Sequence, residues 1–438
     1  MKKKTIAFQT FGCKLNISET STISRNFIEY GFELVSHKDK ADVYVINSCL
    51  VTAVAEKKCR AAIRQVHKRN PNAIIAVIGC YSQLRSDEIS KIPGVNYVLG
   101  NIEKFSLLEY ILKNNDKTIK VETSGLKSDK TFNPSYSTEG HTRSFFKVQD
   151  GCDYFCTYCT IPFARGRSRS DTIENTIKVA EEIGKTDFKE IILTGVNIGD
   201  FGKNNNETFF DLIKQLDKVK GIERIRISSI EPELLTDEII EFIASSKKIL
   251  PHFHIPLQSG SNRILAAMKR KYNRELFSER IKKIKQLIPD ACIAIDVIVG
   301  FPGETCEDFS DSFKFIEQSQ ISYIHVFSYS DRPDTLSSKM KNKVSNSEKK
   351  QRSKDLHLLS EKMKLSFYEQ NVNKIAKVLF ESDCKENFIF GYTENYIRVK
   401  TKIDKSLINE IIKVRLNEID SDGVFKIIFR DEQCTNIQ

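Results

Sequence analysis

The chain has 438 residues, a formal net charge of +10 at pH 7 and 40% hydrophobic residues. That length indicates about two to three domains, and the hydrophobic share excludes a wholly disordered protein. The basic excess fits a nucleic acid, an anionic lipid or an acidic protein as partner. No stretch approaches the roughly 20 apolar residues that span a bilayer, and the N-terminal stretch lacks the apolar core of a signal peptide. We expect a cytoplasmic protein without a membrane partner.

The first region, residues 1–125, alternates apolar β-branched runs with helical stretches. Helices are expected at residues 18–31 and 55–70, and strands at residues 4–12, 41–49 and 73–80. Continuous β-branched strands separated by helices are typical of a parallel sheet. We predict an N-terminal open parallel α/β domain, which ends in a polar stretch that we interpret as a linker.

The second region, residues 138–367, repeats the order strand then helix six times. The expected strands are residues 144–149, 190–196, 224–230, 252–257, 291–300 and 323–330. Six such units predict a partial parallel (β/α)6 barrel, in which functional residues gather in the loops after the strands. Residues 338–354 are rich in lysine and form either a surface helix or a hinge.

The last region, residues 370–438, has short alternating strands joined by turns. This pattern predicts a small β-barrel of the OB-like kind. The whole chain is therefore expected to be an α/β protein of three domains.

Three cysteines crowd into the stretch "GCDYFCTYC", directly after the first predicted strand of the partial barrel. Cys152, Cys156 and Cys159 form a C-x3-C-x2-C pattern in a loop that Gly151 opens. Close thiolates bind three corners of a 4Fe-4S cluster and leave the fourth iron open for a small ligand. Structural zinc normally takes four protein ligands, and no fourth Cys or His lies nearby in sequence. A cluster is the main interpretation; zinc or buried core cysteines are the alternatives.

A second set of cysteines follows the three N-terminal strands. Cys13, Cys49 and Cys80 end the stretches "FQTFGC", "VINSC" and "VIGC". Because the carboxyl ends of parallel strands share one edge of a sheet, these thiols are expected to converge. The alternative is that they pack in the core, as cysteines often do. Cys59 lies inside a predicted helix and is interpreted as a helix residue, not a ligand.

Loops after the barrel strands carry glycines and polar residues suited to a ligand with an amine, a carboxylate and a ribose. The cofactor-binding candidates are Gly195, Asn197, Ser228, Glu231, Gln258, Asp296 and Gly300. Any βα loop needs turn residues, so each of these loops alone is also explained by turn geometry. His252 and His254 alternate on one strand and are interpreted as polar residues beside a pocket.

Arginines flank the central cysteines, and aromatic residues lie between them. We predict RNA contacts for four of them, Arg143, Arg165, Arg167 and Arg169. Guanidinium groups bind phosphate and aromatic rings stack on bases, so the combination favours nucleic acid. A solvated basic face over core aromatics is the alternative.

With both cysteine sets in view, the chain resembles the methylthiotransferases, a branch of the radical S-adenosylmethionine (SAM) enzymes. The family's cluster motif matches Cys152, Cys156 and Cys159, and its second cluster matches Cys13, Cys49 and Cys80. "PLQSGSNRILAAMKRKY" and "DVIVGFPGET" resemble its barrel motifs, and the C-terminal barrel resembles the RNA-binding TRAM domain. The resemblance covers nearly the whole chain.

The stretches "FGCKLNISET" and "CDYFCTYCTIPFARGRSRS" are similar to the MtaB-like branch, with a small departure at Thr160. That branch adds a methylthio group to carbon 2 of N6-threonylcarbamoyladenosine at position 37 of tRNA. The alternatives are the branches that act on isopentenyladenosine in tRNA or on an aspartate of a ribosomal protein. A non-catalytic, metal-containing RNA-binding protein is a further alternative.

The resemblance implies two 4Fe-4S clusters and SAM as cofactors. It implies that SAM is cleaved reductively at the central cluster, that the radical removes hydrogen from carbon 2, and that the N-terminal cluster presents the sulfur. Both cysteine sets must then face one cavity. The implied partners are tRNA, SAM and an electron donor of the flavodoxin or ferredoxin type, and we expect a monomer.

Overall fold

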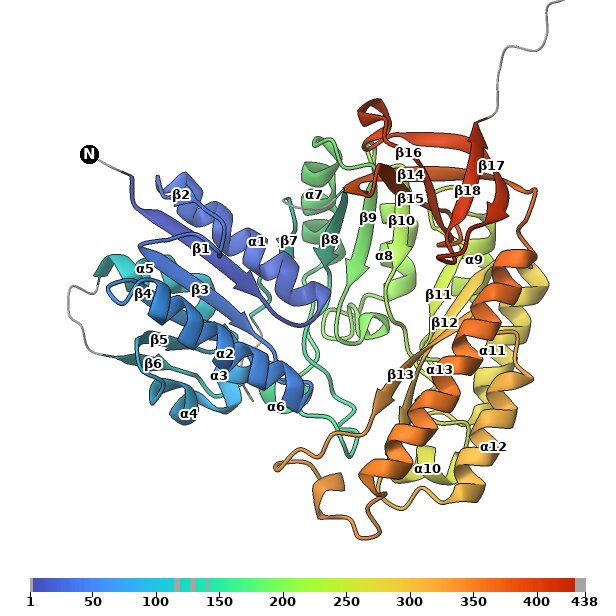
Figure 1. Ribbon diagram of the computed structural model, residues 1–438, viewed down its shortest axis with the longest axis horizontal. Helices are drawn as coiled ribbons and strands as arrows, with labels where there is room; N and C mark the ends of the chain where they lie inside the picture. Colours follow the sequence, from blue (N-terminus) through green and yellow to red (C-terminus); the bar gives the residue numbers. More distant parts are fainter. Residues whose placement is uncertain (1–2, 114–118, 127–130, 139–141, 430–438) are drawn as a thin grey trace, which may run out of the picture.

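A computed structural model describes residues 3–113, 119–126, 131–138 and 142–429 (Figure 1). It contains an N-terminal sheet with helices on both faces, a central half-open barrel and a small C-terminal barrel. Cys434 lies outside the described residues.

The N-terminal part is a six-stranded sheet in the order β2-β1-β3-β4-β5-β6, and all of its strand pairs are parallel. Its strands are β1 (Thr5–Thr10), β2 (Glu33–Leu34), β3 (Val43–Ser48), β4 (Ile74–Gly79), β5 (Val95–Leu99) and β6 (Lys120–Glu122). Its helices are α1 (Lys14–Glu29), α2 (Ala53–Arg69), α3 (Cys80–Leu84), α4 (Ser86–Ser90) and α5 (Leu107–Lys113). One face packs on α1 and α5, and the other on α2, α3 and α4. Burial on both faces explains the continuous apolar strands.

The central part contains six parallel strands in chain order, preceded by one antiparallel strand. The strands are β7 (Ser135–Tyr136), β8 (Arg143–Lys147), β9 (Glu190–Thr194), β10 (Arg224–Ile227), β11 (His252–His254), β12 (Cys292–Val299) and β13 (Tyr323–Ser328). Bridges such as Ser229 with His254 join β10 to β11, so the two sheets form one curved wall. The predicted α/β class and partial barrel are confirmed.

The outside of this wall is covered by α7 (Ile173–Gly184), α8 (Phe209–Leu216), α9 (Asp237–Ser245), α11 (Arg274–Leu287), α12 (Cys306–Glu317) and α13 (Asn346–Glu369). Two short helices of the described residues lie in the loops after the strands: α6 (Ile161–Arg165), which packs against α3, and α10 (Asn262–Ala267). The lysine-rich stretch at residues 338–354 supplies the start of α13, which Ser345 caps by accepting a hydrogen bond from the Glu348 amide.

The C-terminal part is a closed barrel in the order β14-β15-β16-β18-β17. Its strands are β14 (Ile375–Lys385), β15 (Phe388–Thr393), β16 (Arg398–Lys402), β17 (Ile411–Ile419) and β18 (Phe425–Phe429). It lies at the amino ends of the central strands (Figure 1). Arg224, which begins β10, donates to the Lys377 carbonyl at 2.6 Å, and His252, which begins β11, stacks on Tyr396 at 4.4 Å. The limits of the three domains stay a prediction.

Helix α1 joins the N-terminal part to the central part, running beside β7 and β8 (Figure 1). Glu19 on α1 is fully buried and touches three cations: Lys104 at 2.6 Å, Lys147 at 2.9 Å and Arg165 at 3.1 Å. Burial opposes ionisation of this carboxyl, but Arg165 and the two lysines outweigh burial and lower its pKa. Lys147 and Arg165 belong to the central part, so the ionised carboxylate ties the two parts together.

Asp150, directly after β8, extends this buried network. It pairs with Lys147 at 2.9 Å, Arg165 at 3.0 Å and Arg169 at 3.3 Å. Burial opposes its charge, but Lys147 and Arg165 hold the pKa of this carboxyl well below its usual range. Neither carboxylate has solvent to replace a lost partner.

We predict that Glu19→Gln destabilises the folded protein by about 3–5 kcal/mol, because it leaves buried cations without their counter-charge. Chemical denaturation of wild type and variant at neutral pH measures the loss. Since the folded pKa of Glu19 lies below its unfolded value, this contribution is present at neutral pH and is lost in acid.

The matched control is Glu109→Gln, whose ion pair with Lys113 is exposed. We expect little change in the free energy of unfolding for this control. Equal stability of Glu19→Gln and wild type would contradict a role for the network.

Candidate functional site

The central cysteines lie in a loop between β8 and α6 that folds back on itself. Gly151 has φ +71°, and a Cβ there would lie 2.0 Å from the Arg167 carbonyl oxygen, so only glycine fits. The Cys152 amide donates to the Gly166 carbonyl at 3.1 Å, and the Cys159 amide donates to the Cys156 carbonyl at 3.0 Å. These bonds fix the fold of the loop that carries the three thiols.

The three thiols influence one another electrostatically. Burial raises the pKa of Cys152 to about 12, and the thiols Cys159 and Cys156 add to the shift. Burial likewise raises the pKa of Cys159 to about 12, with Cys156 as the next cause. A bound metal supplies positive charge, which favours the thiolate form of such thiols and makes them good ligands. The donor set therefore fits an iron–sulfur cluster.

Arg270 is a site residue that sequence reasoning missed. It follows α10, donates to the Cys156 sulfur at 3.2 Å and forms an ion pair with Glu231. Burial raises the pKa of Glu231 to about 7, although Arg270 acts in the opposite direction. The stretch "MKRKY" gave no periodic or spacing signal that singles out this arginine. Arg270 thus connects the cysteine loop to the polar loop after β10.

The N-terminal cysteines occupy neighbouring strand ends. Cys13 caps α1 after β1, Cys49 follows β3, and Cys80 begins α3 directly after β4. A Cβ on Gly12 would lie 2.9 Å from the Cys49 sulfur, so the backbone before Cys13 runs against that thiol. Burial raises the pKa of Cys49 to about 12, and the nearby thiols Cys80 and Cys13 add to this shift. The strand ends bring the set together.

Buried positive charge surrounds this second set of thiols. Burial opposes the charge of Arg165, but Cys80, Glu19 and Asp150 raise its pKa well above the usual range, and Cys13 contributes. A 4Fe-4S core held by three thiolates carries net negative charge, which a buried guanidinium stabilises. Asn101 also donates to the Cys80 sulfur at 3.6 Å. These residues fit an anionic cluster held by Cys13, Cys49 and Cys80.

The predicted cofactor contacts at β9 and β10 lie beside the central cysteine loop. Gly195 lets Gln149 approach, since a Cβ there would lie 2.9 Å from the Gln149 oxygen. Gln149, which sequence reasoning missed, accepts hydrogen bonds from the Val196 and Asn197 amides at 2.9 Å and 2.8 Å. It also donates to the Gly151 carbonyl at 2.8 Å. The buried side-chain amide of Gln149 thus connects the loop after β8 to the loop after β9.

Several buried polar atoms in these loops are without a hydrogen-bond partner among the described residues. They are Thr194 Oγ1, Asn197 Oδ1 and Ser228 Oγ. A buried polar atom without a partner is costly, and a polar ligand removes that cost. The loops after β9 and β10 therefore fit SAM, which offers hydroxyl, amine and carboxylate groups.

Gln258, Asp296 and Gly300 differ in their surroundings. Gln258 has φ +61° and its amide donates to the Asp296 carbonyl at 2.7 Å. Both side chains face a cavity near Cys159. Gly300 instead lies against α13, where a Cβ would meet the Lys349 side chain at 2.3 Å. The structure thus brings Gln258 and Asp296 together and leaves Gly300 outside that cavity.

A cavity of about 240 Å³ connects the N-terminal part with the central cysteine loop. Its lining is Val51, Thr52, Tyr158, Cys159, Thr160, Ile161, Gln258, Asp296, Ile298, Phe327, Ser328, Tyr329, Ser330 and Arg332. Val51 and Thr52 belong to the segment after Cys49, separated from it by Leu50, and Cys159 itself lines the cavity, so residues near both cysteine sets line one space. Arg332 of the central part pairs with Glu56 of the N-terminal part at 2.8 Å, and Asn101 donates to the Ala164 carbonyl at 2.6 Å. These two contacts join the N-terminal part to the central part.

All four predicted RNA-binding arginines are paired with carboxylates, and the carboxylate nearest to Arg167, that of Asp153 at 3.6 Å, is more distant than those nearest to the other three. Arg165 and Arg169 are buried in the network around Asp150, and Arg143 pairs with Glu381 at 2.8 Å. Arg167 differs, because 60% of its side chain is exposed. An RNA contact stays a prediction for Arg167, whereas burial and pairing explain the other three without RNA.

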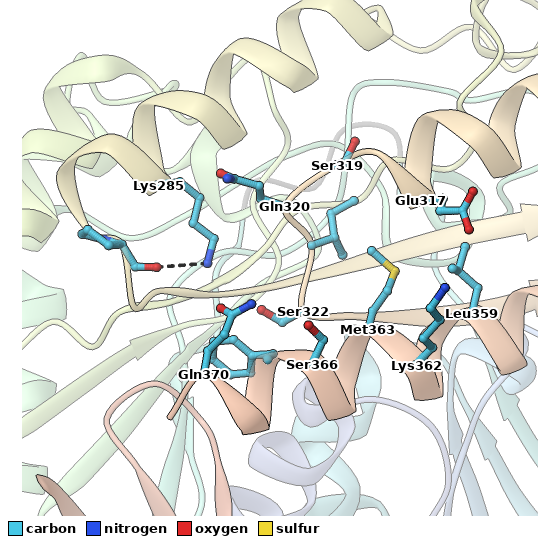
Figure 2. A pocket seen from close by; sticks show the side chains of 13 residues that line it. Lys285, Glu317, Ser319, Gln320, Ser322, Leu359, Lys362, Met363, Ser366 and Gln370 are labelled. Carbon is cyan, nitrogen blue, oxygen red and sulfur yellow. Dashed lines mark hydrogen bonds between the residues drawn. The ribbon is translucent and has the colours of Figure 1, made fainter. Parts of the chain in front are cut away.

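A larger cavity, of about 380 Å³, lies outside the barrel (Figure 2). Lys285 of α11, Glu317 of α12 and Lys362 of α13 line it. Its lining contains no cysteine among the described residues. This outer cavity is therefore remote from the thiol chemistry.

Comparisons with known proteins agree with this geometry. Residues 5–100 match the Uncharacterized protein family UPF0004, and residues 146–316 match the Radical SAM superfamily. The threonylcarbamoyladenosine tRNA methylthiotransferase MtaB of Bacillus subtilis is 39% identical, over 98% of this chain and 98% of the relative. The protein of that name from Aquifex aeolicus is 41% identical, over 90% of this chain and 96% of the relative.

The chain belongs to the tRNA methylthiotransferase family. The family resemblance predicted from the cysteine motifs is confirmed. Another methylthiotransferase relative, tRNA-2-methylthio-N(6)-dimethylallyladenosine synthase of Alkaliphilus oremlandii, is 34% identical, over 95% of this chain and 91% of the relative. The radical SAM methyltransferase TsrM of Kitasatospora setae, solved with tryptophan and a SAM analogue, has a TM-score of 0.57 and 11% identity, covering 87% of this chain and 79% of that one. That likeness shows the fold.

We predict that Gly12→Ala in this methylthiotransferase lowers bound iron from about eight to about four per chain. The new methyl group would lie 2.9 Å from the Cβ and sulfur of Cys49 and so displace that ligand. Iron analysis after anaerobic reconstitution measures the loss.

Gly31→Ala is a matched control, because Gly31 has φ +108°, close to the +104° of Gly12, but no atom within 4 Å of the added Cβ. We expect full iron content in this control. Full iron content in Gly12→Ala as well would contradict the N-terminal cluster site.

Proposed function

We propose that this protein adds a methylthio group to carbon 2 of N6-threonylcarbamoyladenosine at position 37 of tRNA. The observation that carries the proposal is the shared cavity, because residues near both cysteine sets line it. Relatives at 39% and 41% identity that are named for this activity support the choice of substrate.

In this proposal, Cys152, Cys156 and Cys159 hold one 4Fe-4S cluster, and the N-terminal cysteines hold the other. When bound, the clusters and SAM supply the electron, the radical and the sulfur that a non-acidic carbon–hydrogen bond requires. Amino-acid side chains then have to bind, orient and shield the reactants. Asn197 and Ser228 are proposed to hold SAM, since each has a buried oxygen in need of a partner.

The cavity wall is suited to protecting a reactive intermediate. Apolar and aromatic groups form much of it, including Ile298, Phe327 and Tyr329. Tyr158 packs edge-on against Phe301 at 6.4 Å, which keeps the wall rigid next to Cys159. Such a wall excludes water and holds the base in a fixed orientation.

Arg167 is proposed to bind tRNA at the rim. Its guanidinium lies 4.8 Å from the ring centre of Phe155, which itself packs against the exposed Phe163. An exposed arginine beside aromatic rings is suited to phosphate and a stacked base. The C-terminal barrel, which lies at the opposite end of the strands, is proposed to hold a more distant part of the tRNA as a TRAM-like domain.

We further infer a monomer that works in the cytoplasm and receives electrons from a flavodoxin- or ferredoxin-type donor. The tRNA substrate and the free state of ten described cysteines support a reducing compartment. Among the described residues, no helix has the length and apolar character needed to cross a bilayer.

We predict that deleting the gene removes the methylthio group from threonylcarbamoyladenosine in tRNA, as measured by mass spectrometry of digested tRNA. Complementation with the intact gene is expected to restore it. Loss of the methylthio group from isopentenyladenosine instead would assign the chain to the other tRNA branch. Unchanged tRNA with an unmodified ribosomal protein would assign it to the third.

We predict different losses in two cysteine variants of the reconstituted enzyme. Cys152→Ala is expected to abolish SAM cleavage, because its cluster is the one beside the SAM loops. Cys49→Ala is expected to retain measurable SAM cleavage and to lose sulfur insertion. Release of 5′-deoxyadenosine and formation of methylthio nucleoside measure the two steps, and parallel losses in Cys49→Ala would argue against separate roles.

A further inference from the structure

Arg332 has a buried guanidinium group whose hydrogen-bond donors are only partly used. It lies in the loop after β13, lines the cavity of about 240 Å³ beside Cys159, and is only 6% exposed. Its Nη1 donates to Glu56 of α2 at 2.8 Å. Nε and Nη2 are buried and have no hydrogen-bond partner among the described residues. A buried donor without a partner is costly, so this guanidinium has capacity for a ligand.

The two unused nitrogens form one edge of the guanidinium plane. The hydrogens of Nε and Nη2 point in the same direction, so together they match two oxygens of a carboxylate or a phosphate. Nη1 is the nitrogen that Glu56 already occupies. The remaining edge of Arg332 therefore fits a second oxyanion better than it fits a single neutral acceptor.

The surrounding contacts hold Arg332 in place. Its carbonyl accepts hydrogen bonds from the Thr335 amide at 3.0 Å and from the Thr335 hydroxyl at 2.8 Å. The Ser337 amide donates to the Thr157 carbonyl at 2.9 Å, which ties this loop to the cysteine loop. The ion pair with Glu56 ties the side chain to the N-terminal part. An arginine that is fixed in this way loses little conformational freedom when it binds a ligand.

The N-terminus of α2 is a second feature of this cavity that favours negative charge. The helix has 17 residues, and its N-cap residue, Thr52, lines the cavity. The first amides of a helix carry partial positive charge, which attracts anions. Glu56 is the acidic residue of the first turn, and it lies 3.9 Å from Arg60 in addition to its pair with Arg332. Two cations thus share its one negative charge, and the local balance is positive.

A role in joining the two parts of the protein explains only one of the donors of Arg332. The neighbouring pair of Arg85 with Asp334, at 2.6 Å, also joins the N-terminal part to this loop, and it is partly exposed. Such a contact requires one donor nitrogen. Arg332 buries two further nitrogens in the wall of the cavity, which a purely connecting residue does not need.

We infer that Arg332, together with the N-terminus of α2, binds an oxyanion of the substrate nucleotide and so holds that nucleotide in the cavity. This inference rests on the proposed function. Two groups of the proposed substrate offer a pair of negatively charged oxygens. They are the carboxylate of the N6-threonylcarbamoyl group and the phosphates that flank the nucleotide. Both belong to the nucleotide whose carbon 2 reacts, and the chemistry of recognition is the same for both.

The rim of the cavity is suited to the base that accompanies this oxyanion. Val51 and Phe327 both line the cavity, and 55% and 46% of these residues remain exposed. An exposed aromatic ring at an opening offers a surface on which a base stacks. The apolar rim therefore takes the flat base, and the buried guanidinium takes the charge.

The experiment uses three anticodon stem-loops that carry N6-threonylcarbamoyladenosine. One is unaltered, one has a methyl ester on the threonyl carboxylate, and one has neutral methylphosphonates on both sides of the modified nucleotide. Fluorescence anisotropy on the iron-loaded protein without reductant measures affinity. We expect Arg332→Gln to bind the unaltered stem-loop about 10- to 100-fold more weakly than wild type, the range of charge-assisted hydrogen bonds.

The altered stem-loops identify which oxyanion is bound. If Arg332 binds the carboxylate, Arg332→Gln and wild type should bind the methyl ester equally, and the loss should persist with the methylphosphonate. If Arg332 binds a phosphate, the two altered stem-loops should exchange these results. Either result supports the inference. An equal loss on all three stem-loops, or unchanged affinity for the unaltered one, would overturn it.

Arg85→Gln is the matched control, because it breaks the neighbouring pair with Asp334. Arg85 is not among the described residues that line the cavity. This control should bind all three stem-loops as wild type does. The comparison between stem-loops is made within one protein, so a loss of stability does not imitate the expected result. The same change of preference in Arg85→Gln as in Arg332→Gln would overturn the inference.

SAM also carries a carboxylate, and a separate measurement distinguishes it. Arg332→Gln should cleave SAM to 5′-deoxyadenosine at the wild-type rate in the absence of RNA. Loss of this cleavage with intact affinity for the stem-loops would assign the unused edge to SAM and overturn the inference. Failure of the proposed function has a different result, because wild type would then bind the unaltered stem-loop without forming the methylthio nucleoside.

Discussion

The buried ion network between α1 and the central barrel is the constraint on which the site depends. Glu19 and Asp150 face Lys104, Lys147, Arg165 and Arg169 in a region closed to solvent. Each ion alone is costly to bury, and their mutual attraction repays that cost only in the observed arrangement. The network therefore fixes how the N-terminal sheet packs against the barrel. It thereby also fixes the orientation of the two cysteine sets relative to each other.

The network contains more positive than negative charge, and this positive excess is available to stabilise an anionic group. Two carboxylates face four cations, and Arg165 lies close enough to Cys80 and Cys13 for both thiols to raise its pKa. Without negative charge on those thiols the excess would be a cost to folding. An anionic cluster at the strand ends supplies that charge, so docking of the two parts and cluster binding stabilise each other.

Local patterns explain which features were predictable from sequence. Short stretches of sequence contain the spacing of Cys152, Cys156 and Cys159 and the strand runs before Cys49 and Cys80. Because the carboxyl ends of parallel strands share one edge of a sheet, these runs also predict that the N-terminal thiols are neighbours. Arg165 was interpreted as an RNA contact because its partner Glu19 lies 146 residues away. Arg270 and Gln149 were missed for the same reason, since long-range contacts give them their place.

Closure of the barrel explains why a polar interior is tolerated in this fold. The C-terminal barrel seals the amino ends of the strands, where Tyr396 stacks on His252 and lies under Arg226 at 4.7 Å. The N-terminal sheet covers the opposite side with its carboxyl edge, so the charged groups between them face a small enclosed space. A barrel covered on both sides limits the access of water to a reactive intermediate, which suits radical chemistry.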